Sequence, residues 1–93
     1  MKSIDFKNFR MYKDIRQKET FVIDVSVNVS DLIYKNTNGI MGHDIALRIY
    51  RSDGPVAFND EELQFLREFA KETTPIFQDS IELNIVEHNE ENS

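Results

Sequence analysis

The side chains best suited to acid–base chemistry or metal binding are the two histidines, His43 and His88. Asp44 follows His43 directly, and a histidine beside a carboxylate can supply two ligands to a metal ion. A stable site needs further ligands on the same face, and the chain offers only His88 and isolated carboxylates. Ser52 could act as a nucleophile beside His43 and Asp44, but it lacks the pair of flanking glycines that marks the sharp turn exposing a catalytic serine. We therefore expect no enzyme activity, no catalytic residue, no metal site and no cofactor.

A run of three acidic residues, Asp60, Glu61 and Glu62, could suggest acid–base work or a divalent cation site. The run directly follows Asn59, which has the right type and position to cap a helix. Asn59 and Glu62 have the spacing of a capping box, and carboxylates in the first turn complement the helix dipole. We interpret the three acids as the start of a helix.

Two glycines, Gly39 and Gly42, precede another predicted helix, where phosphate groups often bind. The segment lacks the Lys-Ser/Thr ending of a P-loop and the third glycine of a dinucleotide-binding loop. We interpret Gly39 as a turn residue and Gly42 as a position of close helix packing.

Aromatic and basic residues are paired repeatedly near the N-terminus. The pairing occurs in Phe6-Lys7, Phe9-Arg10 and Tyr12-Lys13, and Ile15-Arg16 extends it. Rings that stack on bases, interleaved with cations that meet phosphates, are typical of single-stranded nucleic-acid binding. The residues that this pattern assigns to a nucleic acid or to a protein partner are Lys7, Phe9, Arg10, Tyr12, Lys13 and Arg16.

A second interpretation of the same segment needs no nucleic acid. Phe6 and Phe9 would be core residues, and the basic side chains would cover the solvent side of an edge strand. The net charge of −6 repels nucleic acid overall, and it is unevenly spread. Residues 1–19 carry a balance of +3 and residues 53–93 a balance of −9. The acidic half could also occupy a basic nucleic-acid channel, as small proteins that mimic DNA do.

Composition predicts one small domain. The chain has 93 residues, of which 40% are hydrophobic, enough for a packed core but not for two. We expect a single α+β domain over residues 1–86 and a disordered acidic tail over residues 87–93. Cysteine is absent, which excludes disulfides and thiolate chemistry. No apolar run has the length of a signal peptide or a membrane span, so we expect a cytoplasmic protein without a membrane partner.

The predicted sheet is an antiparallel hairpin of residues 4–12 and 20–29. In the second strand, apolar residues occupy every other position, at Phe21, Ile23, Val25, Val27 and Val29. This period of two indicates one buried face and one solvated face. In the first strand the apolar positions change phase, so we expect a bulge near Asn8.

Helices are predicted over residues 31–37, 40–52, 60–72 and 75–86. Ser30 is the expected N-cap of the first helix, and Gly54 is expected to end the second in a left-handed conformation. Thr74 and Pro75 predict the start of the last helix. Two alternatives stay open: residues 31–52 could form one helix instead of two, and residues 81–86 alternate strictly enough to form a third strand.

These features favour a non-enzymatic interaction module that binds another protein or a second copy of itself. The opposed charges of the two ends would let the basic hairpin of one copy meet the acidic helices of another. In size and composition the chain resembles accessory proteins of phages and mobile elements. The alternative function is nucleic-acid binding through the basic, aromatic N-terminal hairpin.

Overall fold

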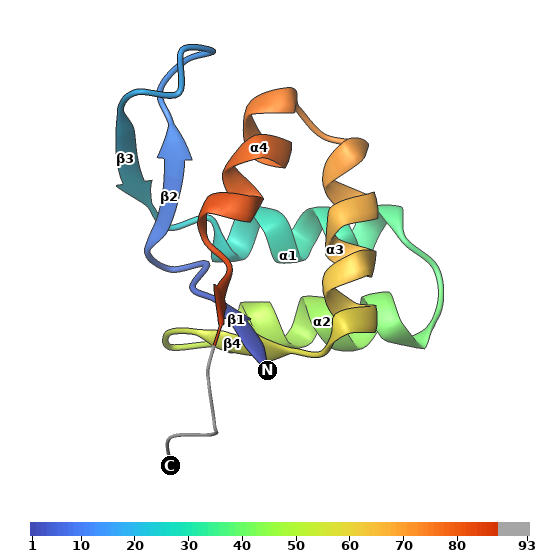
Figure 1. Cartoon of the computed structure of the whole chain (residues 1–93). Coiled ribbons are helices and arrows are strands. Elements are labelled where there is room, and N and C mark those ends of the chain that lie inside the picture. The colour runs from blue at the N-terminus through green and yellow to red at the C-terminus, as the bar shows by residue number, and fades with distance from the viewer. Residues whose placement is uncertain (88–93) are drawn as a thin grey trace.

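The fold is α+β, as the sequence predicts, and the computed structural model describes residues 1–87. Four helices and five short strands make up this described part (Figure 1). The helices are α1 (Ser26–Asn36), α2 (Ile40–Tyr50), α3 (Asp60–Lys71) and α4 (Pro75–Leu83). The strands are β1 (Lys2–Ile4), β2 (Phe9–Tyr12), β3 (Thr20–Ile23), β4 (Val56–Phe58) and β5 (Val86–Glu87). The predicted tail over 87–93 lies outside the described residues except for Glu87.

The strands form two separate antiparallel sheets. In the first, β1 lies between β4 and β5, with Lys2 opposite Phe58 and Ser3 opposite Val86. The second sheet is the β2–β3 hairpin, with Phe9 opposite Ile23. The first sheet joins three segments that are distant in sequence, so it depends on tertiary packing rather than on a local turn.

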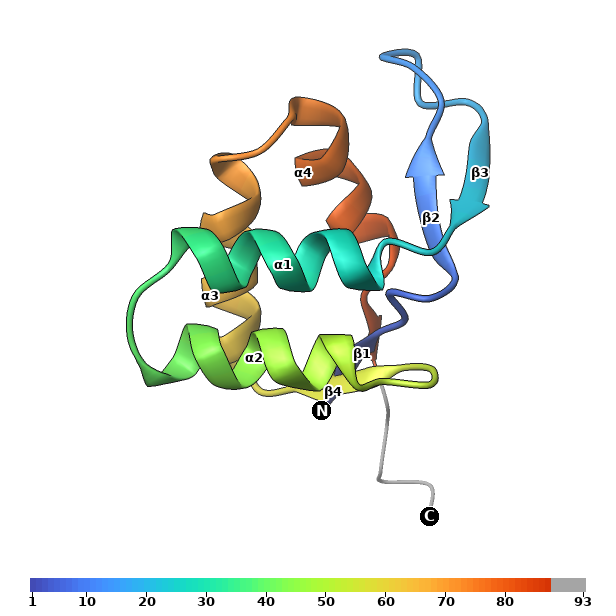
Figure 2. The same cartoon turned by 180° about the vertical axis from the view of Figure 1, so that it is seen from behind.

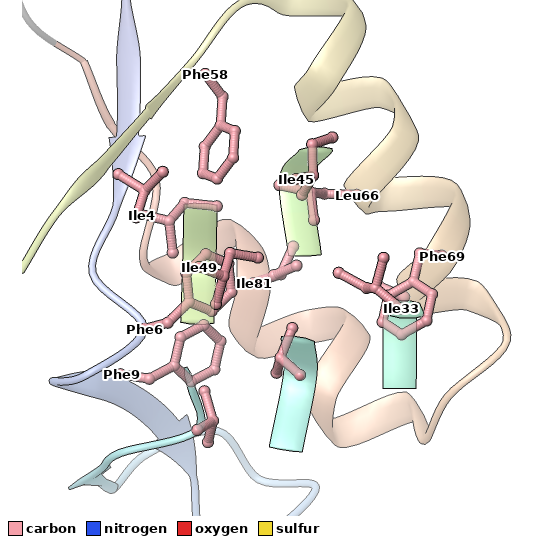
Figure 3. Packing of buried hydrophobic residues seen from close by; sticks show 14 of the residues in the cluster. Ile4, Phe6, Phe9, Ile33, Ile45, Ile49, Phe58, Leu66, Phe69 and Ile81 are labelled. Atoms are coloured by element: carbon pink, nitrogen blue, oxygen red, sulfur yellow. The ribbon is translucent and has the colours of Figure 1, made fainter. Parts of the chain in front are cut away.

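One cluster of buried side chains connects the first sheet, the hairpin and all four helices (Figure 3). Its largest members include three aromatic rings, Phe6, Phe9 and Phe58. Phe6 and Phe9 stack with ring centroids 5.9 Å apart, and the ring of Phe9 also stacks on that of Phe77 at 5.5 Å. Phe9 therefore links the hairpin to α4 and to the centre of the fold.

The prediction of a single strand over residues 20–29 is wrong. β3 ends at Ile23, and α1 begins at Ser26. Val25, the residue directly before α1, and Val29, within α1, are buried, whereas Val27 is 57% exposed. Valines spaced by four positions fit a helix as well as a strand. Hydrogen bonds from the Ser26 amide and hydroxyl to the Asp24 carboxylate stabilise the change of direction between β3 and α1.

The first predicted strand, residues 4–12, is also divided. β1 and β2 belong to different sheets, and a turn at Asp5–Asn8 separates them instead of a bulge. The Asp5 carboxylate accepts hydrogen bonds from the amides of Lys7 and Asn8 at 3.0 and 3.1 Å, which stabilises this turn. The change of phase in the apolar pattern therefore marks a change of sheet.

The region 31–52 forms two helices, and their ends differ from the prediction. α1 starts before the expected cap, so Ser30 lies buried inside it and donates to the Val27 carbonyl at 3.1 Å. Gly39 has a positive φ of 95° and directly precedes α2. α2 ends at Tyr50, and Gly54, which lacks a positive φ, lies in the loop to β4.

The two local start signals near the C-terminus are confirmed. Asn59 and Glu62 form a capping box at the start of α3, and Pro75 opens α4 after the Thr74 cap. α4 ends at Leu83, earlier than the predicted residue 86, and β5 follows it. Of the two alternatives for residues 81–86, the helix is confirmed as far as Leu83. The third strand is wrong for most of this range, because only Val86 lies in a strand, and that strand pairs with β1 and not with the β2–β3 hairpin.

Candidate interaction surface

The β2–β3 hairpin stands beside the helices, with β2 between β3 and α4 (Figures 1 and 2). Two polar side chains of the α4 region hold the inner edge of β2. Asn84 accepts the Arg10 amide at 2.8 Å and donates to the Arg10 carbonyl at 2.8 Å. Ser80 accepts the Tyr12 amide at 3.0 Å. The inner edge of the hairpin is therefore satisfied by side chains rather than by a third strand.

The outer edge of β3 presents backbone groups that have no partner in the described part of the chain. In antiparallel pairs, successive residues direct their amide and carbonyl groups to opposite edges. The Arg10 and Tyr12 amides face α4, so the backbone groups of Met11, which lies between them, face β3. Arg10 is opposite Val22 and Tyr12 is opposite Thr20, so Thr20 and Val22 direct their backbone groups outward.

The side chains of β3 leave a large apolar area beside this open edge. Val22 is 61% exposed, and Phe21 and Ile23 are each 41% exposed. Phe21 and Ile23 lie opposite Met11 and Phe9, on the face of the hairpin that turns toward the core. Val22 lies on the other face, which is solvated. We define the open edge surface as the outer edge of β3 with the side chains of Phe21, Val22 and Ile23.

Sequence reasoning assigned Phe21 and Ile23 to the core and so missed this surface. Alternation in a strand indicates two faces, but it does not show whether an element exists to cover the apolar one. The one available signal is that Thr20–Ile23 contains no charged residue and no proline, the usual protection of an edge strand.

The predicted partner-binding residues lie on β2 and the loops around it, but not on one surface. Phe9 is fully buried and stacked on Phe77, so its predicted contact with a partner is wrong. Arg10 is exposed on the solvated face, and Tyr12 is half-buried. The assignment of the other five residues stays a prediction.

Most of these basic side chains have acidic neighbours. Lys13 pairs with Glu19 at 3.3 Å, and Arg16 pairs with Asp14 at 2.7 Å. Hydrogen bonds from Arg16 lower the pKa of Asp14. Lys7 approaches Asp24 at 3.9 Å. Cations that already have carboxylate partners are less available to phosphates, so these contacts do not favour nucleic-acid binding.

Asp24 lies at the junction between β3 and α1 and is exposed. Its Oδ1 accepts the Ser26 hydroxyl at 2.6 Å and the Ser26 amide at 2.9 Å. These hydrogen bonds favour the ionised carboxylate, so they lower the pKa of Asp24 below its ordinary value. A negative charge is thus held at one end of the open edge.

The residues considered for chemistry lie apart from this surface. His43 is exposed on α2, and its ring centroid lies 5.9 Å from that of Tyr34. Glu62 caps α3 and pairs with Arg48. Among residues 1–87, no group of three or more histidine, aspartate or glutamate side chains is placed to hold a metal ion. In the same range, no helix has the length and apolarity needed to cross a membrane.

A second apolar surface lies on the outer side of the α1–α2 pair. A hollow of about 300 Å³ there is lined by Val27, Tyr34, Leu47 and Tyr50, among other residues. Val27, Tyr34 and Tyr50 are each more than half exposed. The hollow presents side chains only, because the backbone groups within these helices are already paired.

Comparison of the chain with family models, curated proteins and solved structures found no match.

Proposed function

We propose that this protein is a non-enzymatic interaction module that binds an extended segment of a protein chain along β3. The observation that carries the proposal is the open edge: the outward backbone groups of Thr20 and Val22 lie beside three exposed apolar side chains. Addition of a strand to a sheet edge combines main-chain hydrogen bonds, which supply affinity, with side-chain contacts, which supply selectivity.

The anchoring of the hairpin supports this function. Three hydrogen bonds join the backbone of β2 to the side chains of Asn84 and Ser80, and Phe9 fixes the same strand to the core. β3 is in turn paired with β2 along its whole length. The edge is therefore ordered before a partner arrives, which reduces the conformational entropy lost on binding.

The short length of the edge limits its affinity. β3 has four residues, of which two direct their backbone groups outward. The net contribution of each hydrogen bond to the binding free energy is only about 0.5–1.5 kcal/mol. An added strand must therefore also bury Phe21, Val22 or Ile23. We infer a reversible, weak interaction rather than a permanent complex.

Photocrosslinking in the native cell tests this function. A photoreactive amino acid at position 22 should give covalent protein adducts. The matched control is position 27, where the native residue is also an exposed valine but lies on α1. Adducts at position 22 alone support the proposal. Adducts at position 27 alone would place the interaction on the α1–α2 hollow, and adducts at neither position would remove the proposal.

A further inference from the structure

We propose that the strand added to β3 is the β3 of a second copy of this chain, paired antiparallel about a two-fold axis at Phe21. This inference rests on the proposed function and names its partner. The result would be a continuous four-stranded sheet in the order β2-β3-β3-β2, with a helical body at each end.

The register follows from the two outward-facing residues. In a symmetric antiparallel pair, the residue at the axis lies opposite its own counterpart. With the axis at Phe21, Thr20 of each copy lies opposite Val22 of the other. These are the residues whose backbone groups face outward, so the two pairs exchange four hydrogen bonds. Ile23 of each copy then lies opposite Glu19 of the other, just before β3.

The register with the two-fold axis one residue further along, at Val22, satisfies fewer backbone groups. With the axis at Val22, Thr20 would lie opposite Asp24 of the other copy. Asp24 lies beyond the end of β3, where the chain turns into α1 and the Asp24 carboxylate binds Ser26. Of the pairs that would exchange hydrogen bonds, only the one at Val22 itself would then remain within the strands.

Charge complementarity favours a second copy as the occupant. In the register centred on Phe21, Lys18 of each copy comes near Asp24 of the other, just beyond the paired residues at each end. Lys18 is exposed and makes no ion pair within residues 1–87. Within the same residues, the one cation near the Asp24 carboxylate is Lys7, at 3.9 Å. Two opposite-charge pairs would therefore flank the added strands, one at each end.

The two phenylalanines provide the apolar contact. Residues at the axis form a non-hydrogen-bonded pair, in which opposed side chains lie closest. Phe21 is 41% exposed in the single copy, and its ring would be covered by its counterpart. The interface is smaller than that of a standard stable complex, so we expect a dimer that is populated at roughly 0.1–1 mM protein.

Analytical ultracentrifugation of the purified chain, from about 10 µM to about 1 mM, tests the dimer. The parent protein should dimerise with concentration, and added salt should weaken the dimer. Val22→Lys should weaken association at least about tenfold, because it places a charge on the edge beside Lys18 of the other copy. Val27→Lys, a matched change from exposed valine to lysine, should dimerise like the parent.

Disulfide trapping tests the register without relying on the strength of the dimer. The chain has no cysteine, so a single introduced thiol gives an unambiguous product. At the axis, opposed Cβ atoms lie about 4.5–5.5 Å apart, close to the span of a disulfide. Phe21→Cys should therefore form a covalent dimer on mild oxidation at least about tenfold faster than Val27→Cys, which lies away from the edge.

The outcomes separate this inference from the proposed function. A parent protein that stays monomeric at 1 mM, together with equal trapping of the two cysteine variants, overturns the two-fold dimer. If position 22 still crosslinks a different protein in the cell, the open edge binds a foreign segment and the proposed function stands. If photocrosslinking in the cell also gives no adduct at position 22, both the two-fold dimer and the proposed function are rejected.

Discussion

Asn84, the residue after α4, binds both backbone groups of Arg10 in β2. Its Oδ1 accepts the Arg10 amide and its Nδ2 donates to the Arg10 carbonyl, each at 2.8 Å. The same Nδ2 donates to the Ser80 carbonyl at 2.7 Å. One amide side chain thus replaces a neighbouring strand on the inner edge of the hairpin, and it leaves the outer edge of β3 as the open one.

Removal of this amide should destabilise the protein. Asn84→Ala leaves the Arg10 backbone groups without their partner, at a residue that is only 8% exposed. We expect the free energy of unfolding to fall by about 1–3 kcal/mol in urea titration. Hydrogen exchange should also show faster exchange of the Arg10 amide. Asn28→Ala, at an exposed position on α1, is the control and should be near neutral; equal losses in both variants would contradict this role for Asn84.

Gly42 should not tolerate a side chain. A Cβ there would collide with Thr37 Oγ1 and come within 3.2 Å of Phe65 Cζ. Thr37 Oγ1 cannot move freely, because it donates to the Ile33 carbonyl at 2.7 Å at the end of α1. Gly42→Ala should therefore lower stability by about 1 kcal/mol, since overpacking of about 1–3 kcal/mol exceeds the gain of about 1 kcal/mol in helix propensity.

The matched control for Gly42 is Gly54→Ala. A Cβ at Gly54 meets nothing within 4 Å, and this glycine does not have a positive φ. Its replacement should be neutral or slightly stabilising, because alanine restricts the unfolded chain. Thermal unfolding of the two variants measures the difference, and a Gly42→Ala protein as stable as the parent would show that the α1–α2 contact is loose.

Asp24 should make the stability of the protein sensitive to acid. Its pKa is lowered in the folded state by the hydrogen bonds from Ser26. The stabilisation is therefore fully present above the ordinary carboxyl pKa of 3.8, and it is lost as the pH falls through the folded-state pKa. Asp24→Asn keeps an acceptor oxygen but not the charge, so the parent should be more stable than this variant near pH 6.

The difference between the parent and Asp24→Asn should shrink as the pH falls from the ordinary carboxyl pKa of 3.8 through the lowered folded-state pKa of Asp24. Urea titrations at several pH values measure it. Asp53→Asn is the control, because Asp53 is an exposed aspartate that makes no hydrogen bond in the described structure. A difference between parent and Asp24→Asn that is independent of pH would show that the carboxylate charge does not matter at this helix start.

Local signals explain which elements could be predicted from the sequence. The capping box of Asn59 and Glu62 and the Thr74-Pro75 start are each complete within a few residues. Their hydrogen bonds form inside one helical turn, so neighbouring residues alone determine them. α3 and the start of α4 were accordingly found where they were expected.

Longer-range contacts decided the rest. Val25 and Val29 satisfy a period of two and a period of four, so their spacing cannot distinguish a strand from a helix. Packing against the rest of the core selects the helix, because it buries Val25 and Val29 and leaves Val27 exposed. β4 and β5 likewise exist as partners of β1, across more than fifty residues in one case and more than eighty in the other.

The sequence by itself determined the α+β class and the helix starts that are capped locally, but it left Phe9 open between a partner-binding role and the core. Tertiary structure alone decided that Asn84 would occupy one edge of the hairpin and that no element within residues 1–87 would cover the other. The physical reason is that a strand directs half of its backbone groups to each side, whatever its side chains are. Which edge of a strand has its backbone hydrogen bonds satisfied depends on the elements that fold against that edge. Here the packing left the backbone groups of Thr20 and Val22 facing outward.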